Sequence, residues 1–152
     1  MELNASRVIN ASRADVWTHL NSAETLAACI PGCEELTGSP EDGFEATVKQ
    51  KVGPVKATFK GGVTLSDIVP EESYLIKGEG KGGVAGFAKG QAKVWLTDHE
   101  DGTELHYEVE AKVGGKIAQL GSRLIDGFAR KMADQFFERF QNILEGTTET
   151  ES

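Results

Sequence analysis

The sequence predicts an α+β domain in which a curved antiparallel sheet of about seven strands wraps around a long C-terminal helix, with two short helices after the first strand. Two observations support this prediction. From Pro31-Gly32 to about residue 113, apolar residues alternate with polar ones, as in strands that bury one face. From residue 115 to 145, the apolar residues recur with the helical period instead. A sheet with one apolar face needs a cover, and only this helix is large enough to provide it.

The N-terminal part is expected to hold one strand and two short helices. The segment ELNASRVI can form a strand over residues 2–10. Ser12 is a suitable N-cap for the first helix, with Asp15 three residues later, and Ser22 is a suitable cap for the second. Pro31-Gly32 would end the second helix.

Strands are then expected to follow one another, joined by short turns. The alternation is clearest in GFEATVKQKV, VKATFKGGVTLSD and TELHYEVEAKV. Turns are expected at segments rich in Gly, Pro, Asp or Ser, namely SPEDG, VGP, VPEES and HEDG. This succession predicts an antiparallel meander with one dry face.

The last helix, predicted over 115–145, would bury a stripe of large apolar side chains. Gly146 is expected to end it, and residues 147–152 (TTETES) are expected to form a flexible tail. The chain of 152 residues is therefore predicted to form a single domain over 1–146.

The net charge limits the functions that can be expected. It is −8 at pH 7, which argues against nucleic acid as a partner and against general electrostatic docking on anionic lipid. The N-terminus, MELNASRVINASR, is polar, so no signal peptide is expected and the protein is predicted to be cytoplasmic.

Cysteine and histidine spacing gives no sign of a metal site. Cys29 and Cys33 are spaced Cys-x-x-x-Cys, which matches neither a redox pair nor a zinc site. The histidines (His19, His99 and His106) are scattered. Two reduced, largely buried thiols and no metal are expected.

Three segments carry a resemblance to a known family. They are CIPGCEEL, GKGGVAGFAKGQAKVWL and VGGKIAQLGSRLIDGFARKMADQFFERF. Through them, residues 1–145 resemble the CoxG family, named for the CoxG subunit of carbon monoxide dehydrogenase, in the START/polyketide-cyclase-like (SRPBCC) superfamily. The resemblance implies a helix-grip (START-like) fold. It also implies a non-catalytic accessory protein whose partners are the subunits of a carbon monoxide dehydrogenase-type molybdenum hydroxylase, and whose cargo is a membrane quinone.

Small residues on the dry face of the central strands indicate a cavity. Alternation places Gly78, Gly80, Gly90 and Ala92 on that face, where a filled core needs large side chains. Glycines at 121 and 127 would thin the covering helix. We therefore predict an apolar ligand site between sheet and helix, lined by Phe59, Val63, Ala92, Val94, Tyr107, Val109, Leu124, Phe128 and Met132.

The predicted cavity offers few polar contacts. Tyr107 and Gln50 are the candidates for a hydrogen bond to a ligand carbonyl, although each could equally satisfy the backbone. No cofactor is predicted beyond a bound quinone or another apolar ligand.

Three other interpretations stay open from the sequence. The glycines could simply permit bending, with aromatic side chains filling the space. The protein could be an assembly, maturation or recruitment factor without a ligand. It could also be an enzyme like the cyclases and dehydratases of the same superfamily, but the inner face offers no Asp, Glu, His or Lys, so catalysis is not expected.

Membrane contact is expected to be weak and peripheral, at the inner membrane face. Because the net charge is negative, such contact would depend on a local apolar surface. The candidates are Val84 and Phe87 in the loop GKGGVAGF, or Ile117 and Leu120 near the start of the last helix.

Overall fold

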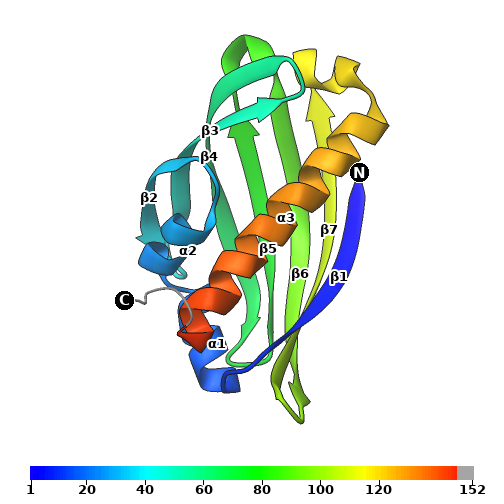
Figure 1. Ribbon diagram of the computed structural model, residues 1–152. Coiled ribbons are helices and arrows are strands. Elements are labelled where there is room, and N and C mark those ends of the chain that lie inside the picture. Colours follow the sequence, from blue (N-terminus) through cyan, green and yellow to red (C-terminus); the bar gives the residue numbers. More distant parts are fainter. Residues whose placement is uncertain (147–152) are drawn as a thin grey trace.

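The computed structural model describes residues 1–146, which form one seven-stranded antiparallel sheet and three α-helices (Figure 1). The strands follow the spatial order β1-β7-β6-β5-β4-β3-β2, so the meander predicted from the alternation is confirmed. The strand bounds are β1 (Glu2–Ile9), β2 (Cys33–Ser39), β3 (Gly43–Val52), β4 (Val55–Val69), β5 (Ser73–Lys81), β6 (Phe87–His99) and β7 (Gly102–Gly114).

Two short helices, α1 (Arg13–Leu20) and α2 (Ala23–Cys29), lie between β1 and β2. The Ser12 hydroxyl accepts a hydrogen bond from the backbone N–H of Asp15 at 3.2 Å. In the same way, the Ser22 hydroxyl accepts one from the N–H of the residue three positions later, at 3.3 Å. Each bond satisfies an N–H group that has no partner inside its helix, and both predicted helix starts are confirmed.

The long helix is shorter than predicted. In place of one helix over 115–145, the chain forms a 3₁₀ segment, η2 (Lys116–Leu120), and then α3 (Ser122–Glu145). Gly121 lies between them with a φ of 92°, a left-handed conformation that interrupts the helical path and favours glycine. The 24 residues of α3 give a length of about 36 Å. The helix crosses the concave face of the sheet diagonally (Figure 1) and ends at Gly146 as predicted.

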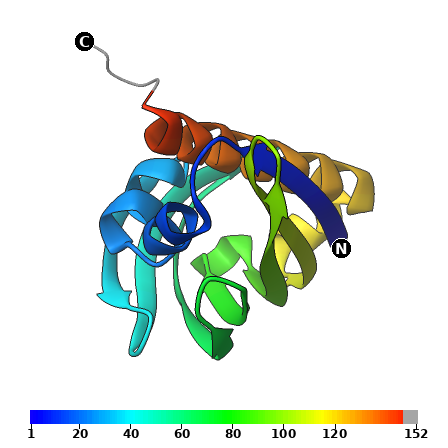
Figure 2. The same cartoon turned by 90° about the horizontal axis from the view of Figure 1, so that it is seen from below.

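The tightly packed core lies toward one end of the molecule. There the C-terminal half of α3 packs with α1, α2 and β1, and the Phe140 side chain is fully buried. Figure 2 shows the sheet curving beneath α3, with the short helices closing one side. The buried members of this cluster are Leu3, Ile9, Val16, Leu20, Cys29, Tyr74, Val94, Leu96, Leu105, Tyr107 and Phe140.

The other half of the concave face carries small residues. Gly61 of β4 is paired with Gly80 of β5, which is paired with Ala88 of β6. In the neighbouring row, Gly78 is paired with Gly90. The predicted alternation of β5 and β6 is confirmed, and it brings small residues side by side on neighbouring strands.

These glycines serve two different purposes. A Cβ atom at Gly61 would collide with the backbone carbonyl of Glu79, and one at Gly90 would collide with that of Glu110. The close approach of the strands therefore requires glycine at both positions. By contrast, a Cβ atom at Gly80 would meet nothing within 4 Å. Bending of the sheet and open space above it occur together, so the two interpretations of the glycines do not exclude each other.

The tail predicted for 147–152 lies outside the described residues. No helix within residues 1–146 is both long enough and apolar enough to span a bilayer.

Candidate functional site: an apolar cavity between the sheet and α3

An open cavity of about 500 Å³ lies between the concave face of the sheet and the helices. Strands β2 to β7, the α1–α2 region and a single residue of α3 contribute to its lining, and the surface that faces it is almost entirely carbon. The apolar side chains of the lining are Leu20, Leu26, Ile30, Leu36, Phe44, Ala46, Val48, Phe59, Val63, Leu65, Tyr74, Ile76, Ala88, Ala92, Val109, Ala111 and Phe136.

Four of the residues that the sequence predicted for this site line the cavity, namely Phe59, Val63, Ala92 and Val109. They lie on β4, β6 and β7, where strict alternation fixes the face that each side chain occupies. All four are only half-buried, so the cavity is open to solvent in this half of the sheet.

Two predicted residues, Val94 and Tyr107, belong instead to the packed core beside the cavity. They are paired with each other across β6 and β7, and they lie on the correct face. The Tyr107 ring stacks on Phe137 of α3, with 4.8 Å between ring centroids. The helix therefore covers this row of the sheet, and no open space is left above it.

The three residues predicted from the long helix, Leu124, Phe128 and Met132, do not line the cavity. Because α3 crosses the sheet diagonally, its first turns lie over the β3–β4 turn, where the Leu124 side chain covers Gly53. Leu124 is 40% exposed, and the lining residue of α3 is Phe136. The predicted thinning of the helix is also wrong, because Gly121 precedes α3 and position 127 is exposed, away from the cavity.

One predicted polar contact is used by the fold. The Gln50 side-chain amide donates a hydrogen bond to the backbone carbonyl of Pro31, so it holds the turn after α2. The other, Tyr107, is buried but does not line the cavity. Burial and the nearby Asp134 carboxylate raise the pKa of Tyr107, and Arg7 partly opposes that effect.

The polar group that sequence reasoning missed is the hydroxyl of Tyr74. This side chain lines the cavity and is 4% exposed. The centroid of its ring lies 5.2 Å from the centroid of the Trp17 ring. Its hydroxyl forms no hydrogen bond within residues 1–146. Burial raises the pKa of Tyr74 well above its ordinary value. The alternation of β5 puts Tyr74 on the same face as Gly78 and Gly80, so the position of the ring can be read from the sequence, whereas the lack of a partner for its hydroxyl cannot.

Charged groups stay out of the cavity. Glu79, Lys89 and Glu110 border it through their strands, but all three are exposed, and the alternation directs their side chains to the convex face. The interior therefore combines a hydrocarbon wall with one buried phenol. Such a site can hold an apolar molecule and form a hydrogen bond with it.

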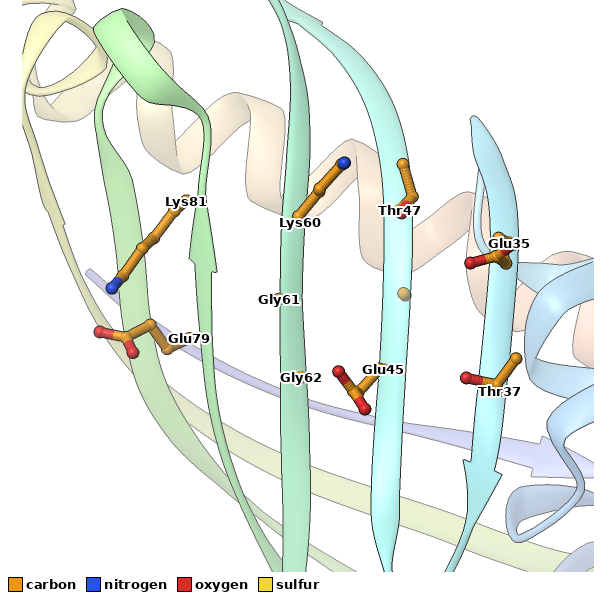
Figure 3. Close-up of a pocket in the computed structure, with 10 residues that line it drawn as sticks. Glu35, Thr37, Glu45, Thr47, Lys60, Gly61, Gly62, Glu79 and Lys81 are labelled. Atoms are coloured by element: carbon orange, nitrogen blue, oxygen red, sulfur yellow. The ribbon is translucent and has the colours of Figure 1, made fainter.

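A second hollow, of about 700 Å³, lies on the convex face over Gly61 and Gly62 (Figure 3). Its charged residues, Glu35, Glu45, Lys60, Glu79 and Lys81, are all exposed to solvent. Within residues 1–146, no three His, Cys, Asp or Glu side chains are grouped so that they could hold a metal ion. The concave cavity is the stronger candidate, since it is apolar and holds a buried polar group without a partner.

Both cysteines are free thiols. Cys29 is fully buried, and burial raises its pKa to about 11 despite the opposing charge of Arg139. Cys33 is half-buried, and its thiol lies 3.5 Å from the backbone carbonyl of Glu35. Cys29 is a packing residue, since it belongs to the core cluster.

The chain is similar to one described family and to several solved structures. Over residues 6–145 it matches CoxG, the family of the carbon monoxide dehydrogenase subunit of that name. A conserved protein from Geobacillus kaustophilus is 30% identical, with 97% of each chain covered and a TM-score of 0.89. A protein from Rhizobium leguminosarum is 16% identical, with 95% of this chain and 94% of that chain covered and a TM-score of 0.73.

A more distant structure shares the same fold. A protein from Thermus thermophilus is 12% identical, with 98% of this chain and all of that chain covered and a TM-score of 0.70. No curated protein matches the chain. The family match spans nearly the whole chain, and the sheet and long helix have the helix-grip arrangement that the resemblance implied. The chain therefore belongs to the CoxG family of carbon monoxide dehydrogenase subunits.

Proposed function

We propose that this protein is a non-catalytic accessory protein of a carbon monoxide dehydrogenase-type molybdenum hydroxylase, and that it carries an apolar ligand, a membrane quinone, between membrane and hydroxylase. The observation that carries the proposal is the apolar cavity of about 500 Å³. Sites for small apolar molecules typically measure roughly 300–1,000 Å³. Membership of the CoxG family supports the association with the hydroxylase, because the family is named for a subunit of carbon monoxide dehydrogenase.

A quinone matches the chemistry of this cavity. Its ring and hydrocarbon tail suit the carbon wall, and its carbonyl oxygens accept hydrogen bonds. The Tyr74 hydroxyl can donate such a bond, and its raised pKa keeps the proton in place at neutral pH. Burying a hydroxyl without a partner costs free energy, and a bound carbonyl would remove that cost.

Absence of catalysis is part of the proposal. General acid–base chemistry needs a group that exchanges a proton near neutral pH inside the site. The only titratable side chain that lies buried in the described lining is Tyr74, and burial moves its pKa away from neutrality. A phenol in this state can orient a ligand but is a poor base.

The direct test is mass spectrometry of an organic extract of the native protein, purified without detergent. We expect an isoprenoid quinone in near-equal amount to the protein. The extracted protein should then bind an added decyl-substituted benzoquinone, measured by quenching of the fluorescence of Trp17, whose ring contacts that of Tyr74.

Two results would contradict the proposal. An extract without any apolar molecule, together with no binding of the added quinone, would favour an assembly, maturation or recruitment factor that carries no ligand. Chemical conversion of a bound ligand by the purified protein would favour a cyclase-like or dehydratase-like enzyme.

A further inference from the structure

The cavity is closed at the end where its polar group lies and open at the other. The row of inner residues on β5, β6 and β7 that closes it is buried, namely Tyr74, Val94 and Tyr107. The inner residues of the following rows are only partly buried: Ile76, Ala92 and Val109, then Gly78, Gly90 and Ala111, then Gly80, Ala88 and Val113. A ligand oxygen that reaches the closed end therefore loses its water, whereas an oxygen in the open half stays hydrated.

The closed end offers a ligand one hydrogen-bond donor, the Tyr74 hydroxyl, which has no partner within residues 1–146. The other polar residues that border the cavity are exposed on the convex face: Glu79, Lys89, Gln91 and Glu110. Backbone carbonyls of the strands lie in the plane of the sheet and are directed at neighbouring strands. In the part of the lining that the structure describes, no side chain other than Tyr74 can accept a hydrogen bond from a ligand.

The number of hydrogens at the closed end separates two kinds of ligand. A ligand carbonyl brings no hydrogen of its own, so the Tyr74 O–H finds an acceptor and no donor is left without a partner. A ligand hydroxyl brings a second O–H group. One of the two groups can donate to the oxygen of the other, and the second then has no acceptor in the carbon wall. A buried donor without a partner is costly, whereas an unused lone pair on an oxygen is tolerated better.

We propose that the cavity selects carbonyl compounds over the corresponding alcohols, and therefore holds a quinone more tightly than its quinol. This inference rests on the proposed function, because it names the oxidation state of the quinone that the protein carries. A quinone that takes up two electrons from the hydroxylase and two protons from water becomes a quinol, and each carbonyl oxygen becomes a hydroxyl. Reduction would thus turn a ligand that suits the closed end into one that leaves a donor unpaired there, and the reduced form would be released.

Neither size nor charge gives an alternative reason for such a preference. The two forms differ by two hydrogen atoms and are both neutral, so the carbon wall contacts them alike. A phenolate at position 74 would reverse the preference, since it could accept a hydrogen bond from a quinol and donate none to a quinone. Burial raises the pKa of Tyr74 well above its ordinary value, so the hydroxyl keeps its hydrogen at neutral pH.

Calorimetric titration of the extracted full chain under argon tests the proposal. The probes are decyl-substituted benzoquinone and its hydroquinone. A second, rigid pair, 9-fluorenone and 9-fluorenol, differs in the same oxygen function. We expect the carbonyl compound of each pair to bind about tenfold more tightly, because one buried donor stays unpaired in the other complex. Equal affinities within a pair that binds, or tighter binding of the hydroxyl compound, would overturn the proposal.

The midpoint potential of the decyl-substituted probe measures the same preference independently. A protein that binds the oxidised form more tightly makes that form harder to reduce. Saturating protein should therefore lower the midpoint potential by about 30 mV, which corresponds to a tenfold ratio of affinities for a two-electron couple. An unchanged or raised potential would contradict the preference.

An added acceptor near the closed end should remove the preference. Ala92 lines the cavity in the row next to Tyr74. In Ala92→Ser, the new oxygen can accept the hydrogen of the ligand while its own hydrogen bonds to the backbone. The ratio of quinone to hydroquinone affinity should fall from about tenfold to about threefold or less. A ratio that stays at tenfold would show that the unpaired donor is not the cause and would overturn the proposal.

The matched control is Ala88→Ser, which adds the same group to the same face of β6. Position 88 also lines the cavity, but it lies about 13 Å farther toward the open end, where water already supplies acceptors. This variant should keep the affinity ratio of the wild type. Loss of the preference in both variants would show that a polar wall in general, and not an acceptor at the closed end, controls it, which would overturn the proposal.

The two ligand pairs distinguish failure of this inference from failure of the proposed function. Tighter binding of 9-fluorenone than of 9-fluorenol, without any binding of the benzoquinone, would refute the quinone as cargo and leave the carbonyl preference standing. Equal binding of the benzoquinone and its hydroquinone would refute the preference and leave a quinone carrier standing. No binding of either pair would refute both.

Discussion

Replacing Ala92 by leucine tests whether the space above the central strands is a binding cavity. Ala92 lies between Ile76 and Val109 across the sheet, and all three line the cavity. Leucine adds three carbons, on the order of 100 Å³ if each is taken as about the 30 Å³ of a water molecule. The added side chain would therefore fill about a fifth of the 500 Å³.

The sign of the change in the free energy of unfolding decides whether the space above Ala92 is an open cavity or a filled core. Each fully buried carbon contributes about 0.8 kcal/mol, and the cavity is partly open, so we expect a gain of about 1–2 kcal/mol in the free energy of unfolding. In a filled core, the same three carbons would cost about 1–3 kcal/mol. The ligand-free variant should thus melt at the wild-type temperature or a few degrees above it, and its quinone affinity should fall at least tenfold.

The matched control is Ala133→Leu. Ala133 is a partly buried residue of α3 that packs against the core and does not line the cavity. The same three carbons should destabilise the protein there and leave quinone binding intact. Thermal melts of extracted protein, with and without the decyl-substituted benzoquinone, measure both quantities. An Ala92→Leu variant that is destabilised but binds quinone normally would show that the ligand lies elsewhere.

Tyr74→Phe should weaken quinone binding by roughly three- to tenfold, which is the contribution of one hydrogen bond. The ligand-free variant should be at least as stable as the wild type, because a buried hydroxyl without a partner is removed. Equal quinone affinity in both proteins would exclude the proposed bond. Cys29→Ala or Cys33→Ala should lower stability modestly and leave quinone binding unchanged, whereas stoichiometric zinc in the wild type would contradict a packing role. The contribution of Cys29 to stability should be fully present below about pH 8 and should be lost as pH rises through 9 to 11, by about 2–3 kcal/mol. The reason is that its thiol ionises in the unfolded chain before it does in the fold, where its pKa is about 11; Cys29→Ala should reduce the alkaline loss of stability in a urea titration across that range.

Local patterns in the sequence were sufficient for the starts of the two short helices and for the faces of the strands. The caps at Ser12 and Ser22 depend on hydrogen bonds between residues three positions apart, so they act wherever the helices are placed. Alternation in β5 and β6 identified the concave face correctly, because successive strand side chains must point to opposite faces. The same rule placed Ala92 and Val109 on the cavity wall, where the structure has them.

The path of α3 over the sheet could not be predicted from periodicity. A helical stripe shows which residues face the sheet, but not which row of the sheet each residue meets. The break at Gly121 and the diagonal crossing move Leu124 over the β3–β4 turn and bring Phe136 to the cavity. The unpaired hydroxyl of Tyr74 is likewise invisible in the sequence, since a partner from any other element would have satisfied it.

The sequence by itself determined the order of the elements, the dry face of the sheet and the total charge, because each depends on neighbouring residues or on composition alone. Only the tertiary structure decided where that charge lies. Three segments without Asp or Glu, 49–60, 80–89 and 111–123, are far apart along the chain. Each of them, taken alone, looks like an ordinary turn that contains a few basic residues. Antiparallel pairing of β3 through β7 brings the three segments to the same end of the sheet, because each strand of a meander reverses the direction of the one before it.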